Sequence, residues 1–174
     1  MKESKWYVIT GAPSSGKTTI ISQLSKLGYQ TIPEAARVLI DKEISEGRTL
    51  EEIRKDELEF QRKVLKMKIE IENKISKDNT VFFDRGVPDT IAYYKLYGFN
   101  LEEILKFCKE RTYKKIFFLE PLSFEKDYSR IEDENSSKRL NNLIKRAYID
   151  LGYSVISIPV ISVDERIKFI LSNL

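Results

Sequence analysis

Gly11-Ala12-Pro13-Ser14-Ser15-Gly16-Lys17-Thr18 matches the phosphate-binding pattern G-x-x-x-x-G-K-[ST]. The residues before it read WYVIT, and their aromatic and β-branched side chains predict a buried strand over 6–10. Residues 19–27 follow with apolar side chains at helical spacing, and Gly28 is a suitable helix stop. The motif therefore lies between a strand and a helix. This context favours a nucleotide-binding loop over a glycine-rich turn that binds nothing.

The chemistry of this loop follows from its glycines and from the helix that it opens. Glycines let backbone N–H groups converge on an anion, and the helix N-terminus adds the positive end of its dipole. We expect Lys17 to reach the β- and γ-phosphates and the Thr18 hydroxyl to bind Mg²⁺. The sequence thus predicts binding of a nucleoside triphosphate, with ATP as the phosphoryl donor. The expected nucleotide-binding residues are Gly11, Ala12, Pro13, Ser14, Ser15, Gly16, Lys17, Thr18 and Thr19.

Length and composition indicate one folded P-loop NTPase domain spanning residues 1–174. Hydrophobic residues make up 41% of the chain and charged residues 33%, as in globular proteins. No apolar run reaches the roughly 18 residues that cross a bilayer, and we expect no signal peptide before the first strand. The lone cysteine, Cys108, lies in an apolar helical stretch and predicts a buried thiol. We therefore expect a cytoplasmic protein without a membrane partner, as a monomer or a homodimer.

Charge and residue usage narrow the chemistry further. The net charge is +3 with the lysines scattered along the chain, which does not favour nucleic acid as a partner. The chain contains no histidine, so Ser–His–Asp catalysis and histidine-ligated metals are excluded. Catalysis must then use carboxylates, lysine, arginine and a hard metal ion.

Strands and helices alternate along the sequence, which predicts an α/β fold with a parallel sheet. A long amphipathic helix over 50–77 is expected to pack on the sheet rather than form a dimerising coil. The polar stretch 123–137 is the candidate for a mobile lid. Strands are expected at 6–10, 29–32, 80–84, 115–119 and 153–158, and helices at 19–27, 35–46, 50–77, 88–97, 101–111, from 137 to about 151, and 163–174.

The first cluster beyond the loop is Asp84 with Arg85, after the apolar strand 80–84. Ligands bind at the carboxyl ends of strands in open α/β sheets, so this position faces the phosphates. An apolar strand ending in aspartate is the Walker B arrangement, in which the carboxylate binds Mg²⁺ directly or through water. Arg85 would grip an anion at the same site. The alternative is that Asp84 caps a turn and forms a structural ion pair with Arg85.

Two further clusters lie at other strand ends. Glu34 is expected to deprotonate or orient an acceptor hydroxyl, with Arg37 one helical turn on as a substrate clamp. The spacing fits an alternative equally well. In that alternative, Glu34 stabilises the N-terminus of the helix through its dipole, and Arg37 is exposed to solvent. Arg130, with Asp127 and Glu132 nearby, is the candidate for an arginine that closes over the γ-phosphate. The alternative for that segment is a solvated run of charges.

Three tyrosines follow helical spacing after the Asp84 cluster. Tyr94 and Tyr97 are interpreted as core residues, because such stripes usually pack inside. One of the three, Tyr93 included, remains a candidate to stack on a substrate ring.

The motifs together resemble a family of small AAA-type P-loop ATPases. The resemblance rests on GAPSSGKTT at 11–19, PEAAR at 33–37 and FDRGVPDT at 83–90, and it extends to LGY at 151–153 and VDER at 163–166. That family is related to the nicotinamide riboside kinase domain of bacterial NAD-biosynthesis regulators and, more distantly, to deoxynucleoside kinases. The resemblance implies a three-layer P-loop NTPase fold with a five-stranded parallel sheet, nucleoside/nucleotide-kinase-like.

The resemblance also implies roles for individual residues. Glu34 looks like the carboxylate at the acceptor, Asp84 and Arg85 like the pair between metal and phosphates, and Arg130 like a lid arginine. The loop around Pro159 would lie near the nucleotide base.

Taken together, these features predict a Mg²⁺- and ATP-dependent kinase acting on a small nucleoside, nucleotide or vitamin-like acceptor. Two carboxylate–arginine sites are more than hydrolysis alone requires. The alternative is a regulatory P-loop ATPase that hydrolyses ATP slowly and signals to a protein partner. A GTPase is not favoured, because the guanine motif Asn-Lys-x-Asp does not occur, and a nucleic-acid end kinase would need a basic groove. The expected catalytic residues are Lys17, Glu34, Asp84 and Arg130; the substrate-binding residues are Glu34, Arg37 and Arg85; and the metal ligands are Thr18 and Asp84.

Overall fold

A computed structural model describes residues 4–123, 128–129 and 131–174 of the chain. Its centre is a five-stranded sheet in the order β2-β3-β1-β4-β5, and every neighbouring pair of strands is parallel. This confirms the predicted α/β fold with a five-stranded parallel sheet. The strands are β1 (Trp6–Thr10), β2 (Gln30–Ile32), β3 (Val81–Asp84), β4 (Lys115–Leu119) and β5 (Val155–Ile158).

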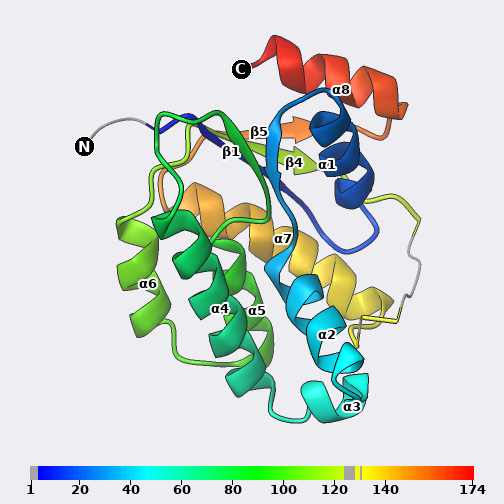
Figure 1. Cartoon of the computed structure of the whole chain (residues 1–174), viewed down its shortest axis with the longest axis vertical. Helices are drawn as coiled ribbons and strands as arrows, with labels where there is room; N and C mark the ends of the chain where they lie inside the picture. The colour runs from blue at the N-terminus through cyan, green and yellow to red at the C-terminus, as the bar shows by residue number, and fades with distance from the viewer. Residues whose placement is uncertain (1–3, 124–127, 130) are drawn as a thin grey trace.

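Helices cover both faces of the sheet, giving three layers (Figure 1). In that view α1 and α8 lie above the sheet and the remaining helices lie below it. The helices are α1 (Lys17–Lys26), α2 (Ala35–Ser45), α3 (Leu50–Ile53), α4 (Glu57–Asn73), α5 (Asp89–Tyr97), α6 (Glu102–Lys109), α7 (Glu134–Asp150) and α8 (Val163–Ser172).

Two apolar cores follow from the alternation of side chains along the strands. Val8 and Phe83 point to one face, where they pack with residues of α5 and α7. Tyr7 and Phe82, one position earlier in each strand, point to the opposite face and pack against α1 and α8. Because β1 is central and buried on both faces, the loop that follows it starts from a fixed position in the core.

The predicted single helix over 50–77 is wrong: the chain forms two helices, α3 and α4, with a break between them. Thr49 opens α3 with a capping box to Glu52. Asp56 then caps α4 by accepting a hydrogen bond from the Glu59 backbone N–H. A second cap only seven residues after the first starts a new helix, because capping residues stabilise helix N-termini. Apolar periodicity continues across the break, so it did not reveal the interruption.

The polar stretch 123–137 is partly helical. Helix α7 begins at Glu134, and Asp133 accepts a hydrogen bond from the Ser136 backbone N–H as its cap. The predicted arginine Arg130 and its neighbour Asp127 lie outside the described residues. The expectation of a lid therefore stays a prediction.

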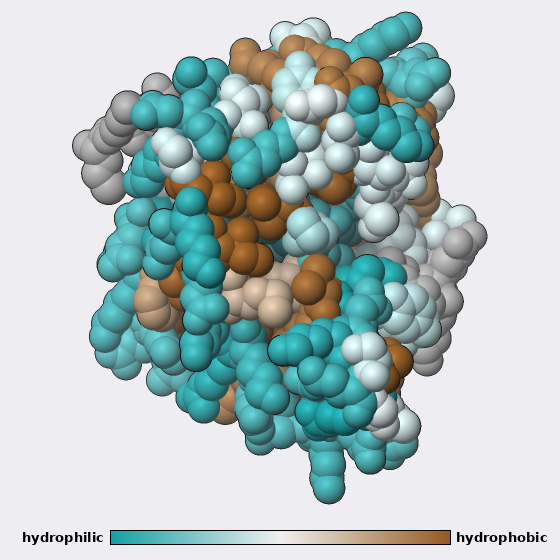
Figure 2. Space-filling view, in the orientation of Figure 1, coloured by the Kyte–Doolittle hydropathy of each residue, from teal (hydrophilic) through white to brown (hydrophobic). Residues whose placement is uncertain are grey.

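Two further expectations concern burial and surface. Cys108 is buried, as predicted. Within the described ranges, none of the helices has the length and apolar character needed to cross a membrane. Figure 2 shows hydrophilic side chains over most of the lower helices and hydrophobic ones gathered at the upper edge over α8, where Val163 and Phe169 are exposed.

Candidate functional site

The loop between β1 and α1 adopts a conformation that depends on its glycines. Gly11 has φ +144°, and a Cβ atom there would lie 2.6 Å from the Leu119 carbonyl oxygen, so a larger residue does not fit. Gly16 has φ +86° and stands at the N-cap position of α1. Ser14 also has a positive φ, 63°. Such left-handed residues let successive N–H groups turn toward one concave surface, which is how phosphate-binding loops bind anions.

Lys17 is buried at the start of α1 and folds back over the loop. Its Nζ donates to the Ala12 carbonyl oxygen at 2.9 Å and to the Ser15 Oγ at 3.2 Å. Burial, followed by the charge of Arg85, lowers the pKa of Lys17 to about 7. Thr18, the next residue, is exposed to solvent. The site therefore holds a desolvated amine that an incoming anion would charge, beside an accessible hydroxyl.

Asp84 ends β3 next to the loop, since Ile9 of β1 pairs with it across the sheet. Its side chain is buried, and among the described residues its Oδ1 has no hydrogen-bond partner. Burial, followed by the negative charge of Glu34, raises the pKa of Asp84 to about 7. A buried carboxylate oxygen without a partner is costly, which is a feature of sites that bind a cation.

Arg85 connects the loop after β3 to the start of α2. It has φ +68°, an unusual conformation for a residue with a Cβ atom, and such strain is concentrated at functional sites. Its Nη1 donates to the Asp89 Oδ1 at 3.0 Å, and its Nε donates to the Glu34 Oε1 at 3.3 Å. Burial alone would raise the pKa of Glu34, but the charges of Arg85 and then Lys17 hold that pKa below its usual range. Glu34 is therefore ionised and can accept a hydrogen bond from a hydroxyl group.

Asp89 supports this arrangement from below and was not assigned a role from the sequence. It is fully buried and accepts hydrogen bonds from Arg85, the Gly86 backbone N–H, and the hydroxyls of Thr10 and Tyr148. These donors come from three segments: the loop after β3, the end of β1 and α7. Asp89 thus fixes the direction of the Arg85 guanidinium toward Glu34.

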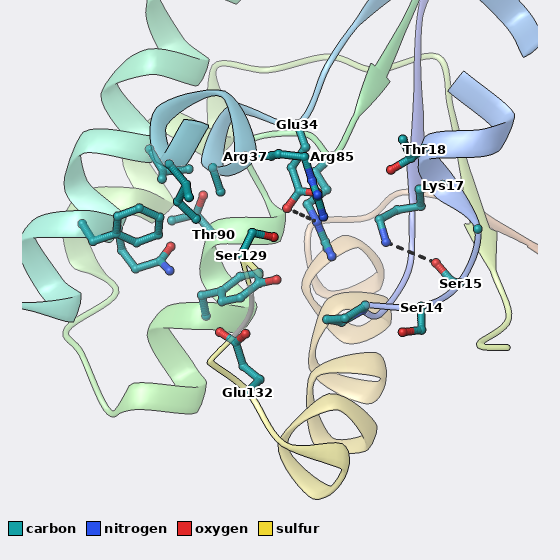
Figure 3. Close-up of a pocket in the computed structure, with 18 of the residues that line it drawn as sticks. Ser14, Ser15, Lys17, Thr18, Glu34, Arg37, Arg85, Thr90, Ser129 and Glu132 are labelled. Atoms are coloured by element: carbon teal, nitrogen blue, oxygen red, sulfur yellow. Dashed lines mark hydrogen bonds and ion pairs between the residues drawn. The ribbon is translucent and has the colours of Figure 1, made fainter. Parts of the chain in front are cut away.

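Lys17, Thr18, Glu34 and Arg85 line a cavity of about 350 Å³ between the loop and the lower helices (Figure 3). Glu34 and Arg85 face Lys17 across this space. The wall away from the loop combines apolar and polar side chains; its members from α2, α4 and α5 are Ala36, Arg37, Ile40, Phe60, Gln61, Val64, Lys68, Thr90 and Tyr93. One end of the cavity thus suits phosphates and the other suits a small molecule with an apolar part.

Lys68 is a buried cation of this wall. Its Nζ donates to the Gly86 carbonyl oxygen at 2.9 Å and to the Thr90 Oγ1 at 3.4 Å. Burial lowers the pKa of Lys68, and the nearby charge of Asp89 partly offsets that effect. Sequence reasoning missed both Lys68 and Gln61. The two residues are seven positions apart, and each is a long polar residue on the apolar stripe of the helix. A polar residue at such a position was the sequence signal that could have identified them.

The end of the cavity far from the loop is a buried polar network. Arg54 donates to both carboxylate oxygens of Glu57 at 2.7 Å and to the Glu132 Oε1 at 3.1 Å. The Tyr97 hydroxyl donates to the same Glu132 oxygen at 2.9 Å. Glu132 therefore belongs to this network, at the end of the cavity far from the loop. Tyr94 is buried in the core, as interpreted, whereas Tyr93 lines the cavity.

Arg37 also lines the cavity, where it meets the polar stretch. Its guanidinium lies over the Tyr128 ring, 5.5 Å from the centroid, and the Tyr128 hydroxyl donates to the Asp41 Oδ1 at 2.6 Å. The structure thus brings together the predicted residues Lys17, Thr18, Glu34, Arg37 and Arg85 around one cavity, with Asp84 next to it. Arg130 cannot be placed, since it lies outside the described residues.

The fold and the loop define the class of protein: a P-loop NTPase of the nucleoside- and nucleotide-kinase-like type. A family model described as an AAA domain matches residues 6–166, and the chain belongs to that family. This agrees with the resemblance to small AAA-type P-loop ATPases stated from the motifs.

Relatives and solved structures agree with this class. Dephospho-CoA kinase of Rickettsia prowazekii (strain Madrid E) is 27% identical over 152 residues, which cover 83% of this chain and 73% of that protein. Deoxyadenosine kinase of M. mycoides, with products bound, superimposes with a TM-score of 0.67 at 16% identity, covering 97% of each chain. The NadR protein in complex with NAD and AMP-PNP gives a TM-score of 0.69 at 16% identity over 97% of this chain and 49% of that one. At these identities the solved structures show a shared fold.

Proposed function

We propose that this protein is a Mg²⁺- and ATP-dependent phosphotransferase that phosphorylates a hydroxyl of a small nucleoside, nucleotide or vitamin-like acceptor. The observation that carries the proposal is the shared cavity. Its upper wall is the phosphate-binding loop, and its lower wall is a separate set of side chains from α2, α4 and α5. An enzyme that only hydrolyses ATP has no need for an enclosed space of this kind, because water requires no apolar wall.

In the proposed reaction the acceptor hydroxyl lies between Glu34 and the γ-phosphate. Its oxygen forms a bond to the γ-phosphorus while the bond from that phosphorus to the β–γ bridging oxygen breaks, and ADP leaves. Glu34 takes the hydroxyl proton, and its lowered pKa keeps it ionised until then. Lys17 and Arg85 stabilise the charge on the transferring group, since phosphoryl transfer depends mainly on positioning and electrostatics.

The residues present fit a magnesium ion. Asp84 contributes a buried carboxylate whose Oδ1 has no partner among the described residues, and Thr18 contributes an accessible hydroxyl. Mg²⁺ is usually bound by one or two such groups together with substrate phosphates and water. Across the described part of the chain there is no cluster of three or more acidic, cysteine or histidine ligands. When bound, the ion would neutralise charge on the phosphate oxygens.

The acceptor wall favours a molecule with a flat apolar part. Phe60 and Tyr93 present aromatic rings, and Ile40 and Val64 add aliphatic surface. Gln61 and Glu132 supply polar groups farther from the loop. A small acceptor with a flat part at this wall is in keeping with the kinase activities named for dephospho-CoA kinase and deoxyadenosine kinase.

The test is ADP release from Mg·ATP, alone and with a panel of nucleosides, mononucleotides and phosphorylatable vitamins. We expect one chemical class to stimulate ADP release strongly and to appear as its phosphate ester by mass spectrometry. A slow and uniform background across the panel would contradict the proposal and favour a regulatory ATPase.

A further inference from the structure

Arg166, near the start of α8, is a buried arginine that contacts the phosphate-binding loop from outside the cavity. It is 3% exposed and lies 151 residues after Ser15 in the sequence. Its Nη1 donates to the Ser15 carbonyl oxygen at 2.7 Å, its Nε to the Pro159 carbonyl at 3.1 Å, and its Nη2 to the Glu120 carbonyl at 3.3 Å. One guanidinium therefore joins the three loops that follow β1, β4 and β5.

The charge of this arginine is not neutralised within the described part of the chain. Its three hydrogen-bond acceptors are backbone carbonyls, and no carboxylate among the described residues forms an ion pair with it. Burial lowers the pKa of Arg166, with no opposing contribution from an acidic neighbour. Buried charges are normally paired, so a full positive charge placed only among carbonyls directly behind an anion-binding loop needs an explanation.

The geometry of the peptide bond supplies that explanation. The Ser15 carbonyl and the Gly16 N–H belong to one planar trans peptide, in which the two groups point in opposite directions. Because the carbonyl is directed at Arg166, the N–H is directed to the other side of the loop. Hydrogen bonding of the carbonyl to a cation also polarises the peptide, which strengthens its N–H as a donor.

We propose that Arg166 is a positioning residue for the donor nucleotide: it fixes and polarises the Ser15–Gly16 peptide so that the Gly16 N–H binds a phosphate of ATP or ADP. The residue acts through this peptide and does not itself contact the nucleotide. Gly16 is held closely on the same side, since a Cβ atom there would lie 3.3 Å from Arg166 Nη1. The proposal rests on the proposed function only in taking this loop as the nucleotide site.

The sequence permits a direct measurement on this one peptide. Ser15–Gly16 is the only Ser–Gly pair among the 174 residues. A sample with ¹³C-carbonyl serine and ¹⁵N-glycine therefore gives a single carbonyl–amide NMR correlation, which reports on both ends of the peptide. Affinity is measured in parallel by titration with a fluorescent ADP analogue, which requires no knowledge of the acceptor.

Arg166→Met is the main variant, and Lys168→Met on the exposed side of the same helix is its matched control. In Arg166→Met we expect the Ser15 carbonyl resonance to shift, the ADP-induced shift of the Gly16 amide to shrink, and ADP to bind at least about tenfold more weakly. Lys168→Met should leave all three unchanged. Arg166→Lys keeps the positive charge but lacks the several N–H donors of the guanidinium. Its affinity for ADP should therefore lie between those of wild type and Arg166→Met.

The outcomes separate the two proposals. Failure of the wild-type protein to bind ADP would contradict the proposed function. If wild type binds ADP and folded Arg166→Met binds it within twofold, or if the Ser15–Gly16 correlation does not move, the role of Arg166 is wrong. If Arg166→Met does not fold, Arg166→Lys decides: wild-type affinity in that variant overturns the proposal, and a loss of affinity with an altered correlation supports it.

Discussion

The two walls of the cavity differ in what they are made of. The donor wall is a continuous stretch of chain, 13–19, whose conformation is set by left-handed residues and by hydrogen bonds to its backbone. The acceptor wall consists of side chains from α2, α4 and α5, together with Ser129 and Glu132. Backbone N–H groups recognise the phosphate oxygens that all triphosphates share, whereas a wall of side chains can have a different shape and chemistry in each protein. On the proposed function, the donor wall would therefore be generic to the class, and the acceptor wall would carry the specificity of this protein.

The largest expected effect tests the donor wall. Lys17→Ala removes the only amine in the loop 11–18 and should reduce turnover by on the order of 10³-fold, because the γ-phosphate loses its main charge partner. The measurement is kcat for ADP formation with the stimulating acceptor. Lys68→Ala, a buried lysine of the acceptor wall, is the comparison and should act mainly on the acceptor KM. Equal losses of kcat in both variants would show that the two walls do not have separate roles.

The second prediction separates chemistry from binding at Asp84. Asp84→Asn keeps the size of the side chain but removes the negative charge expected to bind Mg²⁺. We expect kcat to fall about 10²-fold while Mg-free ADP binds as well as in wild type or better, because a buried negative charge near the phosphates is gone. Parallel losses in kcat and in ADP affinity would instead show that Asp84 is structural.

Glu34→Gln tests the junction between the two walls. The amide keeps a hydrogen-bond acceptor for the hydroxyl but cannot take its proton, so transfer to the acceptor should fall about 10²-fold. Basal hydrolysis of ATP should change little, because water does not depend on the acceptor wall. Both rates are read from one assay that follows ADP and phosphorylated product together. Wild-type transfer in this variant would refute the assigned role.

The depressed pKa of Lys17 predicts a pH dependence of nucleotide binding. In the free protein its pKa is about 7, so the amine is largely neutral above that pH, whereas bound phosphates favour the ammonium form. Affinity for Mg-free ADP should therefore fall as pH rises from 7.5 to 9, by up to about tenfold per unit. Ionisation of Asp84, whose pKa is also about 7, acts in the same direction. Lys17→Arg should show a much shallower profile in the same titrations, and a flat profile for wild type would contradict the prediction.

The contrast between the walls also explains what the sequence could predict. Residues 11–18 form a local motif, and strand ends such as Asp84 and Glu34 meet because parallel strands share one edge. The acceptor wall depends on which helix packs over that edge, and no short-range pattern encodes this packing. Phe60 reads as an ordinary member of an amphipathic helix, and the polar residues Gln61 and Lys68 on its apolar stripe give only an indirect signal of the cavity. The break at 54–56 was hidden because apolar spacing continued through it.

The smallest expected effect concerns Phe60, which lies on the acceptor wall and carries the Arg54 guanidinium over its ring at 4.4 Å. Phe60→Leu keeps an apolar side chain but removes the flat surface, so the acceptor KM should rise about tenfold or less while the KM for ATP stays unchanged. Phe169→Leu, an exposed phenylalanine on α8, controls for the substitution itself. A change in the ATP KM for Phe60→Leu would mean that the aromatic surface binds the donor nucleotide. Phe60 would then have to be assigned to the donor side of the cavity.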